Sequence, residues 1–333
     1  MIKIAINGFG RIGRAAFKIA LAHEGIEVVA INDLGDINNL AYLLKHDSVY
    51  GRYGQEVGVE GGQLVVGGKH VKVCQEKDPA QLPWGALGVD VVLESTGVFT
   101  EKDKASAHIT AGAKFVIITA PTKGEDMPTV VLGVNEKDLA GAQIVSNASC
   151  TTNCAAPMMA VLQNVFGVEK ALLTTAHAYT ATQSIVDGPG GKGDFRRGRA
   201  AAINIVPSAT GAAIAATRTI PELKGKFDGV SLRVPVPVVS ISDITALLKK
   251  DVTVEEVNEA FKQAANNPIY RGVMAVTEEE AVSTDFIGDP HSVIMDLSMT
   301  RVVDGNLVKI MGWYDNEWGY SNRLIEQVEE LVG

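Results

Sequence analysis

A cysteine at the start of a predicted helix is the residue best suited to covalent chemistry in this chain. The segment Ser146–Cys154 joins a strand-like run to a helix-like run, and Ser149, a typical helix-capping residue, precedes Cys150. In the first turn of a helix, free backbone N–H groups and the helix dipole favour a thiolate, which is a nucleophile. Cys150 is therefore a candidate nucleophile. The alternative is a small buried apolar residue, as isolated cysteines usually are.

A second cysteine and a histidine extend this hypothesis. Cys154 follows Cys150 by one helical turn, but no second pair with zinc-like spacing accompanies them, so we reject a metal site. His177 lies near the end of a strand-like run, residues 171–179, among polar residues. Beside Cys150 it would transfer protons. A histidine on a strand is more often a core residue, and the sequence does not show whether the two side chains are adjacent.

Three glycines near the N-terminus indicate a dinucleotide site. Gly8, Gly10 and Gly13 have the G-x-G-x-x-G spacing between a strand-like run and a helix-like segment, residues 11–22. This spacing permits a tight turn, close approach to a pyrophosphate, and close packing of helix on strand, while the helix N-terminus attracts phosphate. Asp33 ends the next strand-like run at the offset of a ribose-binding carboxylate, which would repel a 2′-phosphate. The alternatives are a glycine-rich turn and a capping aspartate. Together the features predict NAD as cofactor.

The first 150 residues alternate short strand-like and helix-like segments. Continuous apolar runs are typical of strands buried on both faces of a parallel sheet, and the alternation predicts a doubly wound, Rossmann-type α/β domain. A hairpin insertion is predicted at residues 63–66 and 70–73. The other predicted strands span residues 2–6, 27–31, 89–94, 114–118 and 143–146.

The pattern changes after residue 150. Long β-rich runs and a hairpin signal at Asp304-Gly305 predict an α+β domain with a mixed or antiparallel sheet. A stretch rich in glycine and arginine, residues 187–199, has little periodicity. Helices are predicted over 151–166, 200–217, 253–265 and 321–332, and strands within 171–179, 230–249, 293–303 and 307–315.

Length and composition limit the possible classes. The 333 residues favour two domains, and 46% hydrophobic with 21% charged residues is ordinary globular usage, which excludes disorder. A net charge of −9 disfavours sequence-independent nucleic-acid binding. Three cysteines fit a reducing compartment, no apolar run is long enough for a membrane helix, and the N-terminus shows no leader. We expect a soluble cytoplasmic protein without a membrane or nucleic-acid partner.

Six segments spread over essentially the whole chain resemble, in order, the phosphorylating glyceraldehyde-3-phosphate dehydrogenases. The nine-residue cysteine motif is very specific, whereas the glycine pattern alone is not. The segments are Asn7–Arg14, Ser146–Cys154, His177–Gln183, Asp187–Pro189, Thr210–Ala213 and Trp313–Tyr320.

The resemblance implies a reaction and a set of catalytic residues. Cys150 would be the nucleophile and His177 its base in the reversible, NAD-dependent oxidation of D-glyceraldehyde 3-phosphate with inorganic phosphate to 1,3-bisphosphoglycerate, through a thioester. Hydroxyls, backbone N–H groups and a guanidinium suit phosphate recognition; strand and cap chemistry is the alternative for each threonine. The implied positions are Thr180 and Arg233 for the substrate phosphate, Ser149, Thr151, Thr210 and Gly211 for the attacking phosphate, and Arg197, which could equally be an exposed loop charge.

The resemblance also implies the cofactor contacts and the assembly. A domain of residues 1–150 would bind NAD, residues 151–315 would be catalytic, and a helix within 316–333 would return to the first domain. The stretch 181–205 resembles a loop that lines a neighbouring subunit's cofactor site, which implies a homotetramer. The implied contacts are Arg11 and Ile12 for the pyrophosphate, Thr96 and Gly97 on the adenosine side, Thr119 near the nicotinamide and Asn316 at its carboxamide.

Some positions depart from the common family pattern, and two other functions are possible. Ile214 replaces a common lysine, and Ala181-Thr182 replaces a frequent Asn-Asp pair. The nearest rival is an erythrose-4-phosphate dehydrogenase, which hydrolyses its thioester; the Thr210–Ala213 run argues against it. The other is a non-catalytic NAD-sensing or redox-sensing interaction protein, and the intact set of Cys150, His177 and Arg233 argues against it, because a pure binder has no need of all three.

Overall fold

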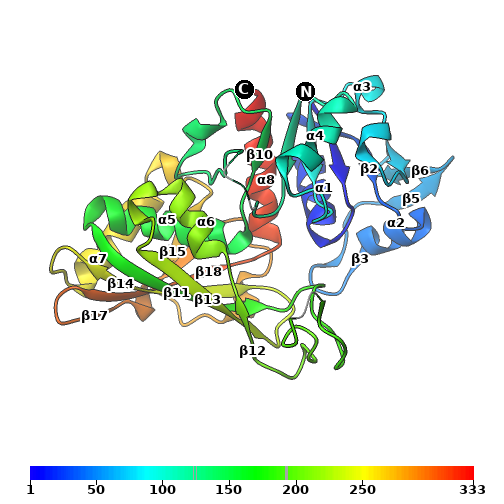
Figure 1. The fold of residues 1–333 in the computed structure, drawn as a ribbon. Helices are drawn as coiled ribbons and strands as arrows, with labels where there is room; N and C mark the ends of the chain where they lie inside the picture. The colour runs from blue at the N-terminus through cyan, green and yellow to red at the C-terminus, as the bar shows by residue number, and fades with distance from the viewer. Residues whose placement is uncertain (123, 125, 192–193) are drawn as a thin grey trace. The chain divides into compact units, whose positions relative to one another are not determined.

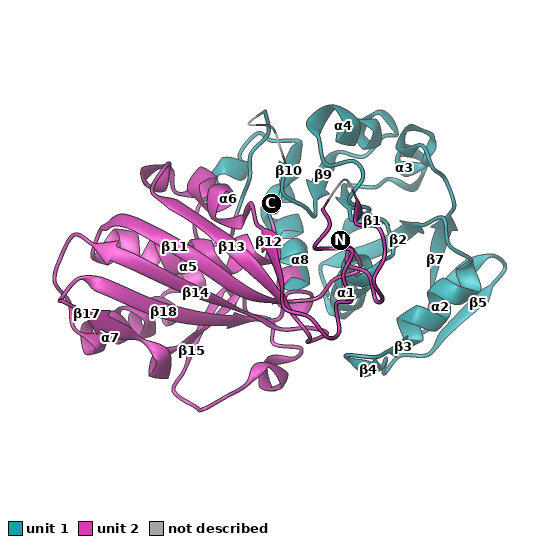
Figure 2. Cartoon of the chain, turned by 60° about the horizontal axis from the view of Figure 1, so that its bottom comes forward, with its two compact units in different colours: residues 1–130, 136–148, 321–333 teal, residues 131–135, 149–320 magenta. Residues whose placement is uncertain are grey.

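The computed structural model describes residues 1–122, 124, 126–191 and 194–333. They form two compact units, coloured separately in Figure 2 and drawn along the chain in Figure 1. Unit 1 comprises Met1–Val130, Glu136–Ala148 and Ser321–Gly333. Unit 2 comprises Val131–Asn135 and Ser149–Tyr320.

Unit 1 is built on an eight-stranded sheet with the order β10-β9-β8-β1-β2-β7-β6-β5. The six strands from β10 to β7 are parallel, and the hairpin of β6 and β5 extends them antiparallel. Numbered along the chain, the parallel strands have the order 3-2-1-4-5-6, which is that of a doubly wound dinucleotide-binding fold. The predicted Rossmann-type fold is therefore confirmed. The strands are β1 (Ile2–Asn7), β2 (Ile26–Asn32), β5 (Val57–Glu60), β6 (Gln63–Val66), β7 (Lys69–Cys74), β8 (Val91–Glu94), β9 (Phe115–Ile118) and β10 (Ile144–Ser146).

The central strands of unit 1 are covered on both faces. Consecutive residues 4–6 of β1 and 91–93 of β8 are all buried, and successive side chains of a strand point to opposite faces. The chain reverses its direction of winding between β1 and β8, which is where ligands bind in such sheets. Its other elements are α1 (Arg11–Ala22), α2 (Ile37–Lys45), α3 (Trp84–Leu87), α4 (Lys102–Thr110), and the small pair β3 (His46–Asp47) and β4 (Gly51–Arg52).

Unit 2 holds a second eight-stranded sheet, with the order β12-β13-β11-β14-β18-β16-β15 and β17 paired to β18. The pairs β11–β13 and β15–β16 are parallel and the others antiparallel, so the predicted mixed sheet is confirmed. The strands are β11 (Val168–Ala178), β12 (Val206–Ala209), β13 (Phe227–Val234), β14 (Ser240–Leu248), β15 (Met274–Thr277), β16 (Val293–Asp296), β17 (Arg301–Val303) and β18 (Leu307–Tyr314). The helices are α5 (Cys150–Val165), α6 (Ala212–Thr219), α7 (Val254–Ala265) and α8 (Trp318–Val332), whose residues from Ser321 on belong to unit 1.

Several local predictions for unit 2 are confirmed. The helix predicted over 151–166 is α5, which packs along β14, β16 and β18 of the sheet. The hairpin predicted at Asp304-Gly305 joins β17 to β18, and both residues have positive φ, 49° and 79°. The helix predicted over 253–265 is α7, and the structure adds that it begins at a capping box in which Thr253 and Glu256 each bond the other's backbone N–H.

The helix predicted over residues 200–217 is wrong. Residues 206–209 form the edge strand β12, and α6 begins only at Ala212. Alanine-rich composition favoured a helix, but Pro207 lies on an edge strand, where the missing N–H is tolerated, and burial alternates along Val206–Ala209. The β-rich run 230–249 is likewise divided into β13 and β14, and a 3-10 turn divides β16 from β17.

Candidate active site

The loop before α5 places Cys150 at the first position of the helix. Ser149 is the N-cap, and its Oγ accepts a hydrogen bond of 3.1 Å from the Thr152 N–H. The preceding Ala148 has φ +56°, an unusual conformation for a residue other than glycine. Cys150 is partly exposed. Because it is the first residue of α5, N–H groups of the helix start can stabilise its thiolate.

The structure brings His177 to the Cys150 thiol. His177 lies near the end of β11, and its Nε2 is 3.4 Å from the Cys150 Sγ. Nucleophile and base in ligand-free enzymes are often slightly further apart than in the reacting complex. The adjacency that the sequence left open is thus present in unit 2.

Arg233 lies on the other side of the imidazole. Strand β13 runs parallel to β11 with Arg233 opposite His177, and the Arg233 Nη1 is 2.7 Å from the His177 Nδ1. Nδ1 is also 2.7 Å from the Ala178 carbonyl oxygen, which lies 3.2 Å from Nη1. Nδ1 can either accept from Nη1, which only donates, or donate to the Ala178 oxygen, and the second tautomer is the one that leaves the other ring nitrogen unprotonated. Nε2 then presents a lone pair to the thiol.

Burial and charge set the protonation of this pair. Burial raises the pKa of the Cys150 thiol, while the Arg233 charge and hydrogen bonds from Thr151 lower it. Burial and then Arg233 lower the pKa of His177 to about 3. Both groups are therefore neutral in the free chain near pH 7, and the thiolate forms when its proton passes to Nε2.

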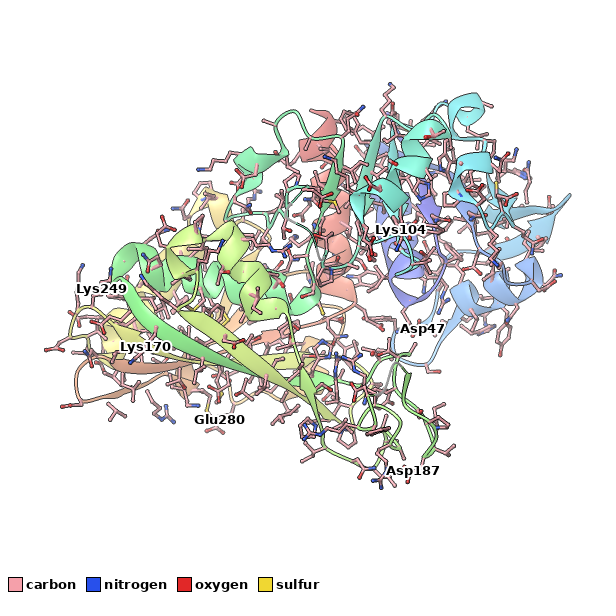
Figure 3. The ribbon with its side chains drawn as sticks, viewed as in Figure 1. Asp47, Lys104, Lys170, Asp187, Lys249 and Glu280 are labelled. Atoms are coloured by element: carbon pink, nitrogen blue, oxygen red, sulfur yellow. The ribbon has the colours of Figure 1, made fainter. Side chains whose placement is uncertain are left out.

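A cationic and hydroxyl-bearing surface adjoins this pair. The Arg197 Nη1 donates to the Thr182 Oγ1 at 3.2 Å, and that oxygen is 2.9 Å from the Thr180 Oγ1. The buried Nε of Arg233 has no acceptor among the described residues. A fixed guanidinium with a free donor, next to threonine hydroxyls and a second arginine, is suited to a phosphate group. Residues 192 and 193 of the adjoining stretch 187–199 lie outside the described residues. Within that stretch Asp187, labelled in Figure 3, pairs with Arg199 at 3.0 Å.

The starts of α5 and α6 lie side by side. The Thr152 Oγ1 at the start of α5 donates to the Ala212 carbonyl oxygen at 3.4 Å, and the Ser149 Oγ is 2.8 Å from the same Thr152 oxygen. Gly211 is the N-cap of α6 and offers no side-chain acceptor, while the Thr210 Oγ1 accepts from the Ala212 N–H. Two neighbouring helix N-termini favour an anion.

Thr151 contributes differently from these residues because its hydroxyl is engaged by a tyrosine. The Tyr314 hydroxyl lies 2.9 Å from the Thr151 Oγ1 and 2.9 Å from the Thr175 Oγ1, and its ring meets His177 edge-on at 6.1 Å. Tyr314 is 1% exposed. Sequence reasoning did not identify it. The apolar alternation along β18 would have indicated burial, but nothing local indicated its partners.

Asn316 is held in unit 2 through a serine. The Ser240 Oγ donates to the Asn316 Oδ1 at 3.0 Å and accepts from the Ala178 N–H at 3.1 Å. The oxygen of the Asn316 side chain is therefore occupied, and its amide nitrogen remains as the donor. Ser240 was also not identified from the sequence.

In unit 1 the three glycines lie where β1, β8 and α1 approach one another. Gly8 has φ +93°, and a Cβ there would lie 2.8 Å from the Ser95 carbonyl carbon and the Thr96 nitrogen. A Cβ on Gly13 would lie 2.1 Å from the Gly8 oxygen, whereas one on Gly10 would meet nothing within 4 Å. Gly8 and Gly13 thus permit the packing of the chain, while Gly10 leaves space at an α1 N-terminus that no side chain caps. This is space that a diphosphate requires.

The remaining residues predicted to contact the cofactor lie at the end of β2, at the start of α1 and after β8 and β9. Asp33 is partly exposed at the end of β2, and its two oxygens accept from the Phe9 and Gly35 N–H groups, both at 2.8 Å. The Arg11 side chain pairs with Asp47 at 2.6 Å. Arg11 and Ile12 are the first two residues of α1, and a helix N-terminus attracts a phosphate. Thr96 and Gly97 follow β8 and are exposed, and Thr119 follows β9. This donor set fits a dinucleotide.

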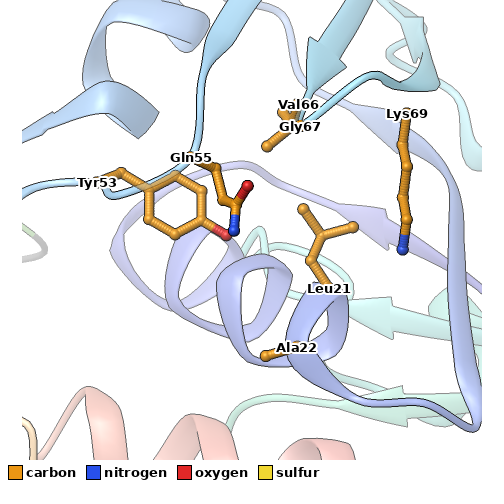
Figure 4. Close-up of a pocket in the computed structure, with 7 residues that line it drawn as sticks. All are labelled: Leu21, Ala22, Tyr53, Gln55, Val66, Gly67 and Lys69. Carbon is orange, nitrogen blue, oxygen red and sulfur yellow. The ribbon is translucent and has the colours of Figure 1, made fainter.

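A separate pocket of about 160 Å³ in unit 1 is lined by none of the predicted site residues (Figure 4). Its lining comprises Leu21, Ala22, Tyr53, Gln55, Val66, Gly67 and Lys69. Among the described residues there is no group of three or more metal-binding side chains. In the same part of the chain, no helix is long and apolar enough to span a membrane.

The fold and the site together define a class of protein. A doubly wound dinucleotide fold binds a nicotinamide cofactor, which can accept a hydride when bound, and a thiol beside a histidine can add to a carbonyl carbon. The chain is an NAD-dependent oxidoreductase that acts on an aldehyde. Residues 149–316 match the C-terminal domain of glyceraldehyde 3-phosphate dehydrogenase, and residues 2–102 match its NAD binding domain. The chain belongs to the glyceraldehyde 3-phosphate dehydrogenase family.

Full-length relatives agree with this assignment. The glyceraldehyde-3-phosphate dehydrogenase of Clostridium pasteurianum is 53% identical over 333 residues, covering 99% of this chain and 98% of the relative. That of Streptomyces coelicolor is 53% identical over 329 residues, covering 98% and 97%. That of Eremothecium gossypii is 50% identical over 333 residues, covering 100% and 99%.

Proposed function

We propose that the chain catalyses the reversible, NAD-dependent oxidation of D-glyceraldehyde 3-phosphate with inorganic phosphate, giving 1,3-bisphosphoglycerate. The observation that carries the proposal is the approach of the Cys150 Sγ to the His177 Nε2, at 3.4 Å, with Arg233 beside the same imidazole. Family membership supports the substrate, since the relatives above carry that name.

Cys150 and His177 carry the covalent steps. As the Cys150 sulfur adds to the aldehyde carbon, its proton passes to the His177 Nε2, which presents the lone pair. The backbone N–H of Cys150 and the imidazolium N–H stabilise the oxyanion of the resulting thiohemiacetal. The chemistry that NAD supplies when bound is acceptance of a hydride from this carbon. Loss of the hydride leaves a thioester on Cys150.

The substrate phosphate and the attacking inorganic phosphate are assigned to different sets of residues. The Arg233 Nε has no acceptor in the part of the chain that the structure describes, and together with Thr180 and Arg197 this arginine is suited to the substrate phosphate. The starts of α5 and α6, with Ser149, Thr151, Thr210 and Gly211, are suited to the inorganic phosphate that cleaves the thioester.

Cofactor contacts are proposed separately for each unit. Those of unit 1 are Gly8, Gly10, Arg11, Ile12, Gly13, Asp33, Thr96, Gly97 and Thr119. In unit 2, the amide nitrogen of Asn316 would donate to the nicotinamide carboxamide, because Ser240 occupies the oxygen. Asp33 favours NAD, since a carboxylate repels a 2′-phosphate.

The domain boundaries, assembly and location complete the proposal. Residues 1–150 bind NAD, residues 151–315 carry the chemistry, and the last helix belongs with the first domain, as the inclusion of Ser321–Gly333 in unit 1 supports. A cytoplasmic homotetramer is proposed. Its assembly is supported by exposed apolar side chains along 181–205, namely Ile185, Val186, Phe195, Ile203 and Ile205, and its reducing compartment by three free thiols. Sedimentation velocity tests the tetramer, and a monomer would contradict it.

The test of the reaction is NADH formation from glyceraldehyde 3-phosphate and NAD, with and without phosphate or arsenate. The expected result is phosphate-dependent turnover by the wild type that disappears in Cys150→Ser. Turnover indifferent to phosphate would point to a hydrolysing enzyme such as erythrose-4-phosphate dehydrogenase. Absence of turnover in a wild type that binds NAD would contradict the proposal and favour a sensor.

A further inference from the structure

A carboxylate is buried at the end of β8, directly beneath the predicted adenosine side of the dinucleotide site. Glu94 is 1% exposed, and among the described residues no lysine or arginine pairs with it. Its Oε2 accepts from the Asn7 Nδ2 at 2.6 Å, and its Oε1 accepts from both the N–H and the Oγ1 of Thr96. Burying a carboxylate without a cation costs free energy, and hydrogen bonds must compensate for it.

The histidine beside Glu94 is fixed in one tautomer. The Trp84 Nε1, which can only donate, lies 3.0 Å from the His108 Nδ1, so Nδ1 must accept. The proton of the neutral imidazole is therefore on Nε2, which donates to the Glu94 Oε2 at 2.9 Å. Trp84 and His108 are completely buried. Glu94 thus accepts from four neutral donors.

Two asparagines on neighbouring strands extend this hydrogen-bond network across the sheet. The Asn32 Nδ2 donates to the Asn7 Oδ1 at 2.7 Å, and the Asn32 Oδ1 accepts from the Glu76 N–H at 2.9 Å. Asn32 and Asn7 end β2 and β1, and each amide has its orientation fixed by its neighbour. The Glu76 N–H, the Asn32 Nδ2 and the Asn7 Nδ2 thus each donate one hydrogen bond in the direction of Glu94, while the Asn32 Nδ2 also donates to the Glu76 carbonyl oxygen.

The exposed end of this network is the turn after β8. The Thr96 Oγ1 donates to Glu94 and accepts from the Val98 N–H at 3.1 Å, while Gly97 has φ +71°. The Thr96 backbone also packs closely against Gly8, where a Cβ would lie 2.8 Å from the Thr96 nitrogen. The position of an exposed turn beside the glycine loop is thus determined by a buried carboxylate.

We propose that Glu94, supported by His108 and Trp84, is a positioning residue for NAD: it fixes the Thr96 hydroxyl and the Thr96–Val98 turn in the geometry that receives the adenosine part. This inference rests on the proposed function for the location of the cofactor. A glutamine at position 94 has one acceptor oxygen, and its NH₂ would face two donors. If the NH₂ faces Asn7 and His108, both of their hydrogen bonds are lost. If it faces Thr96, the bond from the Thr96 N–H is lost and the Thr96 hydroxyl must accept instead of donate.

The test is a double-mutant cycle read by NAD affinity, measured by calorimetry without substrate. Glu94→Gln and Thr96→Val are each expected to raise the Kd for NAD about 10-fold, from loss of hydrogen bonds that order the turn. The Kd for NAD of the double variant should also rise by only about 10-fold over the wild type, because both changes remove the same interaction. Thr96→Ser keeps the hydroxyl and should bind as the wild type does.

The controls separate positioning from general loss of stability. Val92→Ala removes buried volume from the same strand and should lower the melting temperature without changing the Kd for NAD. If Glu94→Gln does not fold, His108→Asn replaces it in the cycle with the same expectation. Wild-type affinity in Glu94→Gln, or losses that multiply to about 100-fold, would overturn the inference. A wild type that binds NAD without turnover would contradict the proposed function alone.

Discussion

The charge of Arg233 is predicted to set how readily Cys150 ionises, separately from any role in binding phosphate. The Arg233 Nη1 is 2.7 Å from the His177 Nδ1, and the Nε2 of the same ring is 3.4 Å from the Cys150 Sγ. Burial raises the pKa of Cys150, and Arg233 is the largest opposing influence. Replacing Arg233 with glutamine should therefore raise this pKa further and reduce the thiolate at neutral pH.

The magnitude follows from the geometry. A unit charge within about 8 Å of the sulfur changes the free energy of the thiolate by about 2 kcal/mol at an effective dielectric constant of about 20. Partial exposure to solvent reduces this interaction, so we expect about a 10-fold smaller thiolate population, equivalent to about 1.4 kcal/mol. Arg233→Lys keeps the charge but lacks the planar fork, so it should keep the thiolate and weaken phosphate binding.

The assay is the rate of carbamidomethylation of Cys150 by iodoacetamide without NAD or substrate, followed by mass spectrometry across pH. Peptide assignment excludes Cys154, whose pKa burial raises to about 12. The rate–pH curve of Arg233→Gln should move to higher pH, and that of Arg233→Lys should coincide with the wild type while its KM for glyceraldehyde 3-phosphate rises. Equal alkylation of Arg233→Gln and wild type, or slow alkylation of Arg233→Lys, would refute the electrostatic reasoning.

Further predictions concern the glycine loop, acid stability and a helix start. Gly10→Ala should fold normally yet lose NAD binding by calorimetry, because its Cβ meets only open space, whereas Gly8→Ala should lower the melting temperature because its Cβ meets backbone at 2.8 Å. The pKa of His177 is lowered to about 3, so an unfolded chain takes up a proton below about pH 6.5 that the folded chain does not. Urea titrations should therefore show stability falling from about pH 6.5 toward pH 3, and falling less steeply in His177→Asn; identical slopes would contradict the assignment. Thr253→Ala removes the capping box with Glu256 and should cost about 1 kcal/mol of unfolding free energy in the same titrations, with activity unchanged.

The residues that could be predicted from the sequence are those whose chemistry depends on local structure. Cys150 was identified because a helix start confers reactivity within a few residues, and Gly8 and Gly13 because a tight turn and a close helix–strand contact need glycine. The parallel first sheet followed from continuous apolar runs. In each case the physical requirement lies within a single loop or element.

The residues that could not be predicted depend on contacts between distant segments. Tyr314 reaches Thr151 across 163 positions of sequence, and Trp84 reaches His108 across 24. Neither contact has a local signature, because a buried tyrosine or histidine on a regular element has the same pattern whatever it touches. The incorrect helix over 200–217 has the opposite cause, since the signal that divides this segment is local: Pro207 is tolerated on an edge strand, and burial alternates along Val206–Ala209.

The pairing of β11 with β13 explains why His177 and Arg233 meet at all. Side chains alternate between the two faces of a strand, so a slip of one residue would turn Arg233 away from the imidazole. The register is held at Gly229, opposite Leu173, where a Cβ would lie 2.5 Å from the Leu173 carbonyl oxygen. Only glycine allows the two backbones to approach so closely. Because β13 pairs parallel to β11 from this contact onward, Arg233 lies opposite His177. The electrostatic environment of Cys150 therefore depends on Gly229, which lies four positions before Arg233 on the same strand.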